Sequence, residues 1–221
     1  MPTNYILTVN FTEQGINTLK QADEQVVIVR PVSPSRPGEL TWLTFFPRTV
    51  STVTWTEEDY YLYIHQPQDG AYLQPGQTID YMNARTLEPV VSGGVYSFNP
   101  QSAFVRVAGD AGPGNVTLSN DCGTYGFFSR DNLYFGLAQN ATVFSDKEIT
   151  KISPLNLVYV PRNQQATFKI TKQVRIFTGD MAASTILGGN LLSKVLDLDF
   201  SDTYEHTIHY DTSLNQFMLG A

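Results

Sequence analysis

From Thr41 to its C-terminus the sequence is a succession of short runs rich in Val, Ile, Thr and aromatic residues. Examples are STVTW at 51–55, YYLYIH at 60–65 and QVRIF at 173–177, and such runs have the composition of β-strands. Turn-forming residues interrupt them about every 8–12 residues, which is typical of sandwiches and barrels. The sequence therefore predicts an all-β protein, an antiparallel β-sandwich with at most one or two short helices.

Two further patterns support this assignment. In KVLDLDF, at 194–200, Leu196, Leu198 and Phe200 share one face of a predicted strand, and the two intervening aspartates share the other. The best helix candidate is 12–22, where Thr12 can act as N-cap. The proline-rich segment 31–40 predicts an irregular loop, because proline cannot donate a hydrogen bond to a sheet.

The middle of the chain resembles itself. WTEEDYYLYIHQ at 55–66 aligns without a gap with FSRDNLYFGLAQ at 128–139, so that Tyr61 meets Tyr134 and Gln66 meets Gln139. Downstream, Ile79 meets Ile149, Phe98 meets Phe168, and VRVAGD (105–110) meets VRIFTGD (174–180). This order of matches predicts an internal duplication of about 70 residues. The recurring glutamines are interpreted as satisfying backbone groups of an adjoining turn.

We expect one cooperative domain over residues 1–221, because an isolated set of three or four strands is only marginally stable. Residues 1–54 would add N-terminal strands with a short helix and the proline-rich loop. Residues 55–127 and 128–190 would be the two repeat copies, and 191–221 a C-terminal hairpin.

Charge argues against a nucleic-acid partner. The 14 Lys and Arg residues are scattered and are outnumbered by 21 Asp and Glu, which gives a formal net charge of −7. No stretch approaches the roughly 18 apolar residues of a transmembrane segment, and no secretion signal is recognisable at the N-terminus. With a single cysteine, these features predict a cytoplasmic protein, with release by a non-classical route as an alternative.

Catalytic and metal-binding signatures are missing from the sequence, so we expect no enzyme, no cofactor and no metal site. His206 and His209 are three residues apart and would point to opposite faces of a strand. Cys122 is interpreted as a buried bystander thiol, with an intermolecular disulfide as the alternative. No phosphate-binding loop, zinc spacing or nucleophile elbow is present.

Aromatic and polar residues near loops are the remaining candidates for ligand binding. In the second copy Gly136 replaces Tyr63, so that Tyr63 could form an aromatic platform that its counterpart lacks. Burial of Tyr63 under a neighbouring loop, and ordinary turn chemistry in the loops 66–76 and 119–126, are the alternatives. The predicted ligand-binding residues are Tyr63, His65, Asp69, Tyr72, Asp121 and Tyr125.

The leading functional hypothesis is a non-catalytic recognition protein. It would be lectin-like or a defensive toxin component, binding a glycan or a membrane-surface ligand through loops at one end of the sandwich. One alternative is a self-assembling structural or storage protein, a homo-oligomer that forms filaments or crystals. A second alternative is a pore-forming protein, with residues 12–22 as its mobile element.

Overall fold

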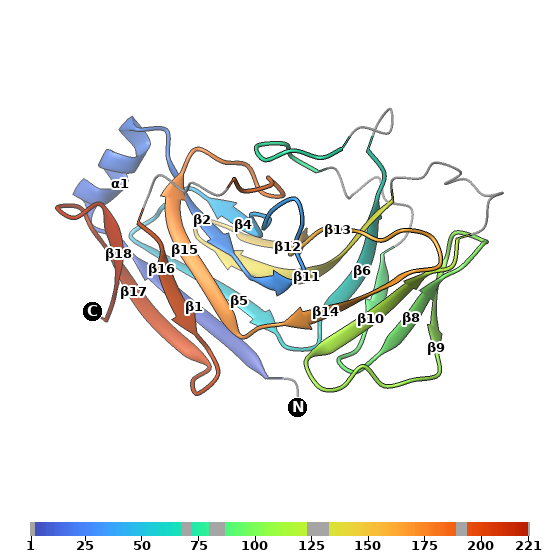
Figure 1. Cartoon of the computed structure of the whole chain (residues 1–221). Helices are drawn as coiled ribbons and strands as arrows, with labels where there is room; N and C mark the ends of the chain where they lie inside the picture. The colour runs from blue at the N-terminus through green and yellow to red at the C-terminus, as the bar shows by residue number, and fades with distance from the viewer. Residues whose placement is uncertain (1–2, 68–71, 80–86, 123–132, 189–193, 221) are drawn as a thin grey trace.

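The structure, a computed structural model, describes residues 3–67, 72–79, 87–122, 133–188 and 194–220. These residues form β-strands in three sheets and one short helix. Figure 1 shows the C-terminal strands β17 and β18 at one end of the molecule and β8, β9 and β10 at the other. The predicted all-β sandwich with at most one or two short helices is confirmed.

The large sheet forms one layer and is built around β11, its longest strand. Its strands run in the order β18 (Gln216–Leu219), β17 (Glu205–Asp211), β1 (Asn4–Asn10), β5 (Val50–Thr56), β11 (Tyr134–Phe144), β6 (Tyr60–His65) and β7 (Glu88–Val90). Two further strands, β12 (Glu148–Pro154) and β13 (Val158–Tyr159), also pair with β11.

The second layer is divided between two smaller sheets. The β10 sheet has the order β3 (Val32–Ser33), β14 (Gln165–Ile170), β10 (Asn115–Asn120), β8 (Val95–Phe98) and β9 (Phe104–Val107). The β15 sheet has the order β16 (Leu196–Asp199), β15 (Gln173–Gly179), β2 (Gln25–Val29) and β4 (Leu43–Phe45).

One hydrophobic core joins all three sheets. The inner face of the large sheet contributes residues such as Leu7 of β1 and Leu137 of β11, and these belong to the same buried cluster as Ile28 of the β15 sheet and Leu118 of the β10 sheet. Such a shared apolar interior supplies most of the free energy of folding of a β-sandwich. Both small sheets therefore pack on the same face of the large one.

Two short connections between the small sheets lie side by side, and we call them the crossings. Residues 30–31 connect β2 to β3, and residues 171–172 connect β14 to β15. The Thr171 hydroxyl donates a hydrogen bond to the Pro31 carbonyl over 2.7 Å. We call this place, where the β10 sheet and the β15 sheet separate, the seam.

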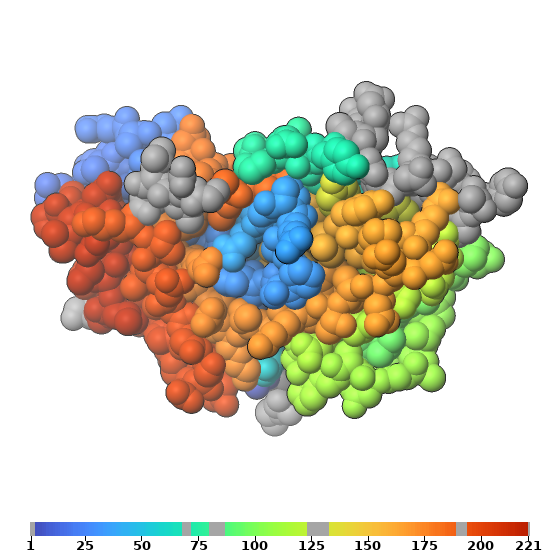
Figure 2. All heavy atoms as spheres, in the orientation of Figure 1, coloured from blue at the N-terminus to red at the C-terminus, as the bar shows by residue number. Residues whose placement is uncertain are grey.

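The proline-rich segment after the first crossing is an irregular loop, as predicted, apart from the two-residue strand β3. Asn156 Nδ2 donates to the Pro34 carbonyl over 2.6 Å, and the Arg36 amide donates to the Leu157 carbonyl over 2.9 Å. In the space-filling view this part of the chain, in mid-blue, lies at the surface between orange segments from the later part of the chain (Figure 2). The loop is therefore fixed by backbone and amide hydrogen bonds.

Several local predictions are confirmed. Helix α1 spans Glu13–Gln21, and the Thr12 hydroxyl accepts a hydrogen bond from the Gly15 amide over 3.1 Å, as an N-cap does. Leu198 and Phe200 are buried while the aspartates of β16 are exposed. The sandwich is not purely antiparallel, however, because β1 pairs with β17 and β8 pairs with β10 in parallel.

The predicted duplication is not shown by the structure. Val105 lies on β9 at the edge of the β10 sheet, whereas its counterpart Val174 is buried within the β15 sheet, between β16 and β2. Ile79 is buried in a loop, whereas Ile149 is exposed on β12. Matched sequences thus occupy different environments, and the match between 55–59 and 128–132 falls partly outside the described residues.

One matched pair does meet in space, and the contact explains its composition. Tyr63 of β6 and Gly136 of β11 are cross-strand partners. A Cβ atom at position 136 would lie 2.6 Å from Cε1 of Tyr63 and 2.0 Å from the Asn156 carbonyl oxygen. Only glycine leaves room for the tyrosine ring and the passing backbone here.

We therefore predict that Gly136→Ala lowers the free energy of unfolding by about 3 kcal/mol or more, because the added methyl group overlaps backbone that cannot move away independently. Gly179→Ala is the matched control. Gly179 is also in a strand, but its Cβ would meet nothing closer than 3.9 Å, so we expect a change below about 1 kcal/mol. Urea unfolding of both variants checks this, and equal midpoints would contradict the assigned packing.

Candidate functional site

The structure corrects the predicted surface platform at Tyr63 and bears out the alternative, burial of this side chain. Its side chain is fully buried, and its hydroxyl donates a hydrogen bond to the Asn156 carbonyl over 2.6 Å. The outer face of the large sheet at this point is covered by a second apolar cluster that includes Leu40, Leu157 and Ile186. Tyr63 is therefore a core residue and forms no surface platform.

The other predicted binding residues lie in different places. Tyr72 is 68% exposed, and His65, at the end of β6, is half-buried. Asp121 is exposed and accepts a hydrogen bond from the Ser97 hydroxyl over 2.7 Å. Asp69 and Tyr125 lie outside the described residues. A binding site made of these loop residues stays a prediction.

The two C-terminal histidines and Cys122 make structural contacts and do not gather in one site. His206 Nε2 is 2.9 Å from the Asp199 carbonyl oxygen, and His209 Nδ1 is 2.5 Å from that of Gly220, so the two rings bond to different segments. Cys122 is buried, and burial raises the pKa of its thiol. Among the described residues, no three His, Cys, Asp or Glu side chains gather as metal ligands would.

A cleft of about 740 Å³ opens at the seam. The large sheet supplies Tyr5 from β1 and the acidic turn 57–59 between β5 and β6. The crossings supply Arg30, Thr171 and Lys172, β14 supplies Ile170, and loops beside the β10 sheet supply 91–92 and 113–114. The cleft therefore lies where all three sheets meet, and its walls come from segments far apart in the sequence.

Arg30 is the most unusual residue of this cleft because it is a buried cation. Its guanidinium carbon lies 5.5 Å from the ring centroids of both Trp42 and Trp55 and 5.9 Å from that of Tyr60. Contacts at this range attract a cation to the ring faces. Nη2 donates to the Thr171 carbonyl over 3.1 Å, which joins the two crossings of the seam.

Gln139 supplies the second anchor for Arg30. It lies on β11 with its side chain facing the core, and its Oε1 accepts a hydrogen bond from Arg30 Nη1. Its Nε2 donates to the Thr56 carbonyl over 2.7 Å, and its own carbonyl accepts from Trp42 Nε1 over 3.3 Å. The interpretation that this glutamine satisfies backbone groups is confirmed at Thr56, which immediately precedes the β5–β6 turn.

Some buried polar atoms near Arg30 lack a hydrogen-bond partner. Within the part of the chain that the structure describes, Arg30 Nε, Trp55 Nε1 and Thr56 Oγ1 are buried without a hydrogen-bond partner. Buried polar groups in folded proteins are nearly always paired, so each such atom calls for an explanation. Of these three residues Arg30 lines the cleft, so a ligand or ordered water there can complete the hydrogen bonding of its guanidinium.

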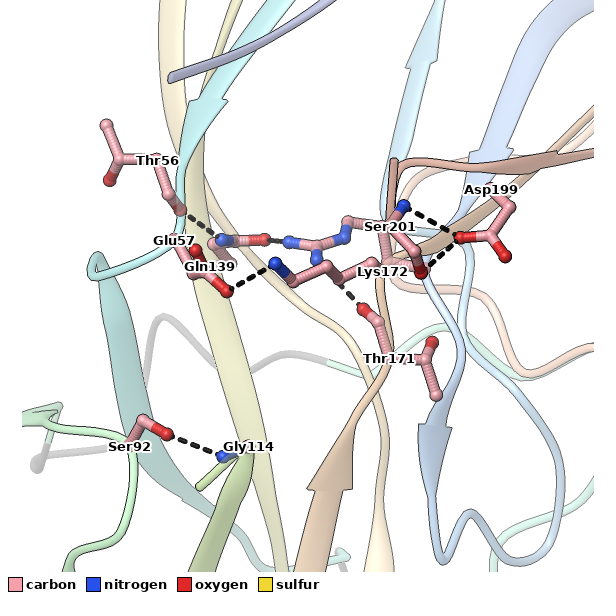
Figure 3. A network of polar contacts seen from close by, with 10 residues as sticks. Thr56, Glu57, Ser92, Gly114, Gln139, Thr171, Lys172, Asp199 and Ser201 are labelled. Carbon is pink, nitrogen blue, oxygen red and sulfur yellow. Dashed lines mark hydrogen bonds and ion pairs between the residues drawn. The ribbon is translucent and has the colours of Figure 1, made fainter. Parts of the chain in front are cut away.

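Lys172 and Glu57 face each other across the opening. Their Nζ and carboxylate oxygen are 3.2 Å apart, and Figure 3 shows the Lys172 side chain extending toward Glu57. The nearby Tyr5 hydroxyl and Glu57 carboxylate raise the pKa of Lys172 above its ordinary value. Burial raises the pKa of the Tyr5 hydroxyl. Lys172 is thus a cation, and Tyr5 a neutral phenol, at neutral pH.

Both positively and negatively charged side chains line the cleft. Arg30 and Lys172 lie on the side of the crossings, and Glu57, Glu58 and Asp59 lie on the turn after β5. Carboxylates accept hydrogen bonds and cationic side chains donate them, so the cleft can bind a small molecule with many hydroxyl groups. The sequence reasoning missed this site, although a lone arginine after the apolar run VVIV and the acidic run EED between two strands are visible signals.

Comparison with protein-family models, curated proteins and solved structures finds no match for this chain. Within the described ranges, no helix has the length and hydrophobicity that a membrane-spanning helix needs. The only support for a function of the seam cleft is therefore the geometry and chemistry of the described residues that line it.

We predict that Gln139→Ala lowers the free energy of unfolding by about 3 kcal/mol, because Arg30 Nη1 and the partly buried Thr56 carbonyl would both lose a partner. Gln66→Ala is the matched control, since Gln66 is the aligned glutamine but is half-buried. We expect a loss below about 1 kcal/mol there. Chemical denaturation measures both, and a loss as large for Gln66→Ala as for Gln139→Ala would contradict the role given to Gln139.

Proposed function

We propose that this protein is a non-catalytic recognition protein that binds a glycan in the seam cleft. The observation that carries the proposal is the convergence of an acidic turn and two cations, one of them buried with an unpaired Nε, on one cleft between three sheets. It keeps the lectin-like class expected from the sequence and moves the site from the loops at the end of the sandwich to the seam.

Size supports a small ligand. Pockets of roughly 300–1,000 Å³ hold drug-sized molecules, and the cleft, at about 740 Å³, lies within that range. A mono- or disaccharide is of this size. The walls come from strands and from turns fixed by backbone hydrogen bonds, such as the 2.8 Å bond from the Gly93 amide to the Asn115 carbonyl. A preformed site of this kind loses little conformational entropy when it binds.

The chemistry of the lining supports a sugar. Sugar rings present hydroxyl groups beside apolar C–H faces, so a complementary site needs acceptors and apolar groups together. Glu58 and Asp59 offer carboxylate acceptors, which form the stronger, charge-assisted hydrogen bonds. Val91 and Ile170 line the same cleft and offer apolar contact. A site for a purely apolar ligand would not place three acidic residues in its wall.

We predict that Asp59→Asn and Glu58→Gln each weaken glycan binding about three- to tenfold, because a neutral amide accepts weaker hydrogen bonds than a carboxylate. A glycan array identifies the ligand, and isothermal titration calorimetry with that ligand measures the affinity. Liposomes run in parallel test the membrane-surface alternative.

Tyr72→Ala and Asp121→Asn serve as controls, because both residues are exposed and lie outside the cleft lining. We expect them to bind as the wild type does. Binding that is lost in these two variants and kept in Asp59→Asn and Glu58→Gln would place the site on the loops. The absence of any bound glycan on the array would overturn the proposal itself.

A further inference from the structure

We infer that the ligand of the seam cleft is an acidic sugar, with a carboxylate of the uronic-acid type bound at the Arg30–Lys172 end. This inference rests on the proposed function and adds the chemical class of the glycan. It follows from three features of the cleft: an uncompensated buried charge, a second cation beside it, and an acidic wall facing both.

The first feature is the missing counter-charge of Arg30. Among the described residues its hydrogen-bond partners are the neutral side chain of Gln139 and the backbone carbonyl of Thr171. None of the salt bridges found there includes it. A buried charge normally has an ionic partner, because desolvation is otherwise uncompensated. Arg30 also keeps an unpaired Nε–H and lines the cleft. An anion from outside would supply both missing partners.

A second arginine of this protein has its charge compensated by carboxylates, and it serves as a comparison. Arg175 on β15 is also partly buried, and it pairs with two carboxylates, Glu39 at 2.5 Å and Asp197 at 3.0 Å. Arg30 is buried more deeply and has aromatic rings in place of carboxylates. The contrast indicates that the charge of Arg30 is held available for a ligand.

The second feature is Lys172, which directly follows the Thr171 carbonyl bound by Arg30. Its ammonium group is at the opening and about 40% of its side chain is exposed. Its present partner, Glu57, is equally exposed and on the opposite wall. A ligand carboxylate entering here meets Lys172 at the mouth and Arg30 below it, and so exchanges its hydration shell for two charged donors.

The third feature selects a carboxylate over a phosphate. A phosphate monoester carries about −1.5 to −2 charges at neutral pH, and Glu57, Glu58 and Asp59 in the same cleft repel it more strongly than a single negative charge. A sugar carboxylate carries one charge and fits the planar fork of a guanidinium. The hydroxyl groups of the same ring then face the acceptors Glu58 and Asp59.

The test compares two ligands with the same skeleton, a glucuronic acid oligosaccharide and the corresponding neutral glucose oligosaccharide, by calorimetry on the full chain. We expect the acid to bind at least about tenfold more tightly, because hydrogen bonds to charged groups are worth that much. The preference should shrink as salt is raised from low to physiological concentration.

Two variants at the opening should act in opposite directions. Lys172→Gln removes a donor and should reduce the preference for the acid about three- to tenfold. Glu57→Gln removes the competitor for Lys172 and should increase it by about two- to fivefold. A structural role of the ion pair would make both variants weaken binding alike. Arg30→Lys keeps the charge but loses the planar fork, and it should abolish the preference if the variant folds.

The outcomes separate the two proposals. Equal binding of the acidic and neutral oligosaccharides, or an unchanged preference in Lys172→Gln, would overturn the inference and leave glycan binding intact. Binding of neither, with an array that detects no glycan, would overturn the proposed function and the inference with it. A preference for the acid that rises in Glu57→Gln and falls in Lys172→Gln would support both.

Discussion

The burial of Arg30 is the constraint on which the centre of this structure depends. A guanidinium removed from water must recover its lost hydration from fixed groups. Part of it comes from β11 through Gln139, from the crossing at 171–172 through Thr171, and from the rings of Trp42, Trp55 and Tyr60, while Nε is left without a partner among the described residues. These groups belong to four separate stretches of chain. Their positions are therefore coupled, because displacing any one of them leaves a charge or an amide unpaired in the core.

The divided second layer explains why this polar centre exists. Two short crossings, at residues 30–31 and 171–172, connect the β10 sheet and the β15 sheet side by side. Crossing segments bring backbone carbonyls that no strand partner satisfies, and polar side chains such as Arg30 and the Thr171 hydroxyl bond to them. Apolar side chains could not fill this place without leaving those carbonyls unpaired. The same geometry keeps a polar cleft open to solvent above the core, and that cleft is the site we propose for a glycan.

Much of the local structure could be predicted from the sequence, whereas the site could not. The Thr12 cap, the alternation in β16 and the irregular proline-rich loop depend on neighbours in sequence, and all three were predicted. The predicted platform at Tyr63 is wrong because alternation along a strand tells which residues share a face and says nothing of what covers that face. Loops carrying Leu40, Leu157 and Ile186 cover it here. The residues that line the cleft lie between positions 3 and 172 of the sequence. Hydrophobic periodicity cannot predict contacts between residues so far apart in the chain.

By itself the sequence determined the class of the fold. The chain has strand-forming runs, frequent turn residues and few charged residues. These features favour a β-sandwich, because its core buries aromatic and β-branched side chains. Only the tertiary structure decided that the second layer is split, that β1 lies parallel to β17, and that Arg30 meets Gln139 across 109 positions. The physical reason is that side-chain period and turn chemistry act over a few residues. The pairing of a buried charge is decided by whichever distant groups the shared core brings within hydrogen-bond range.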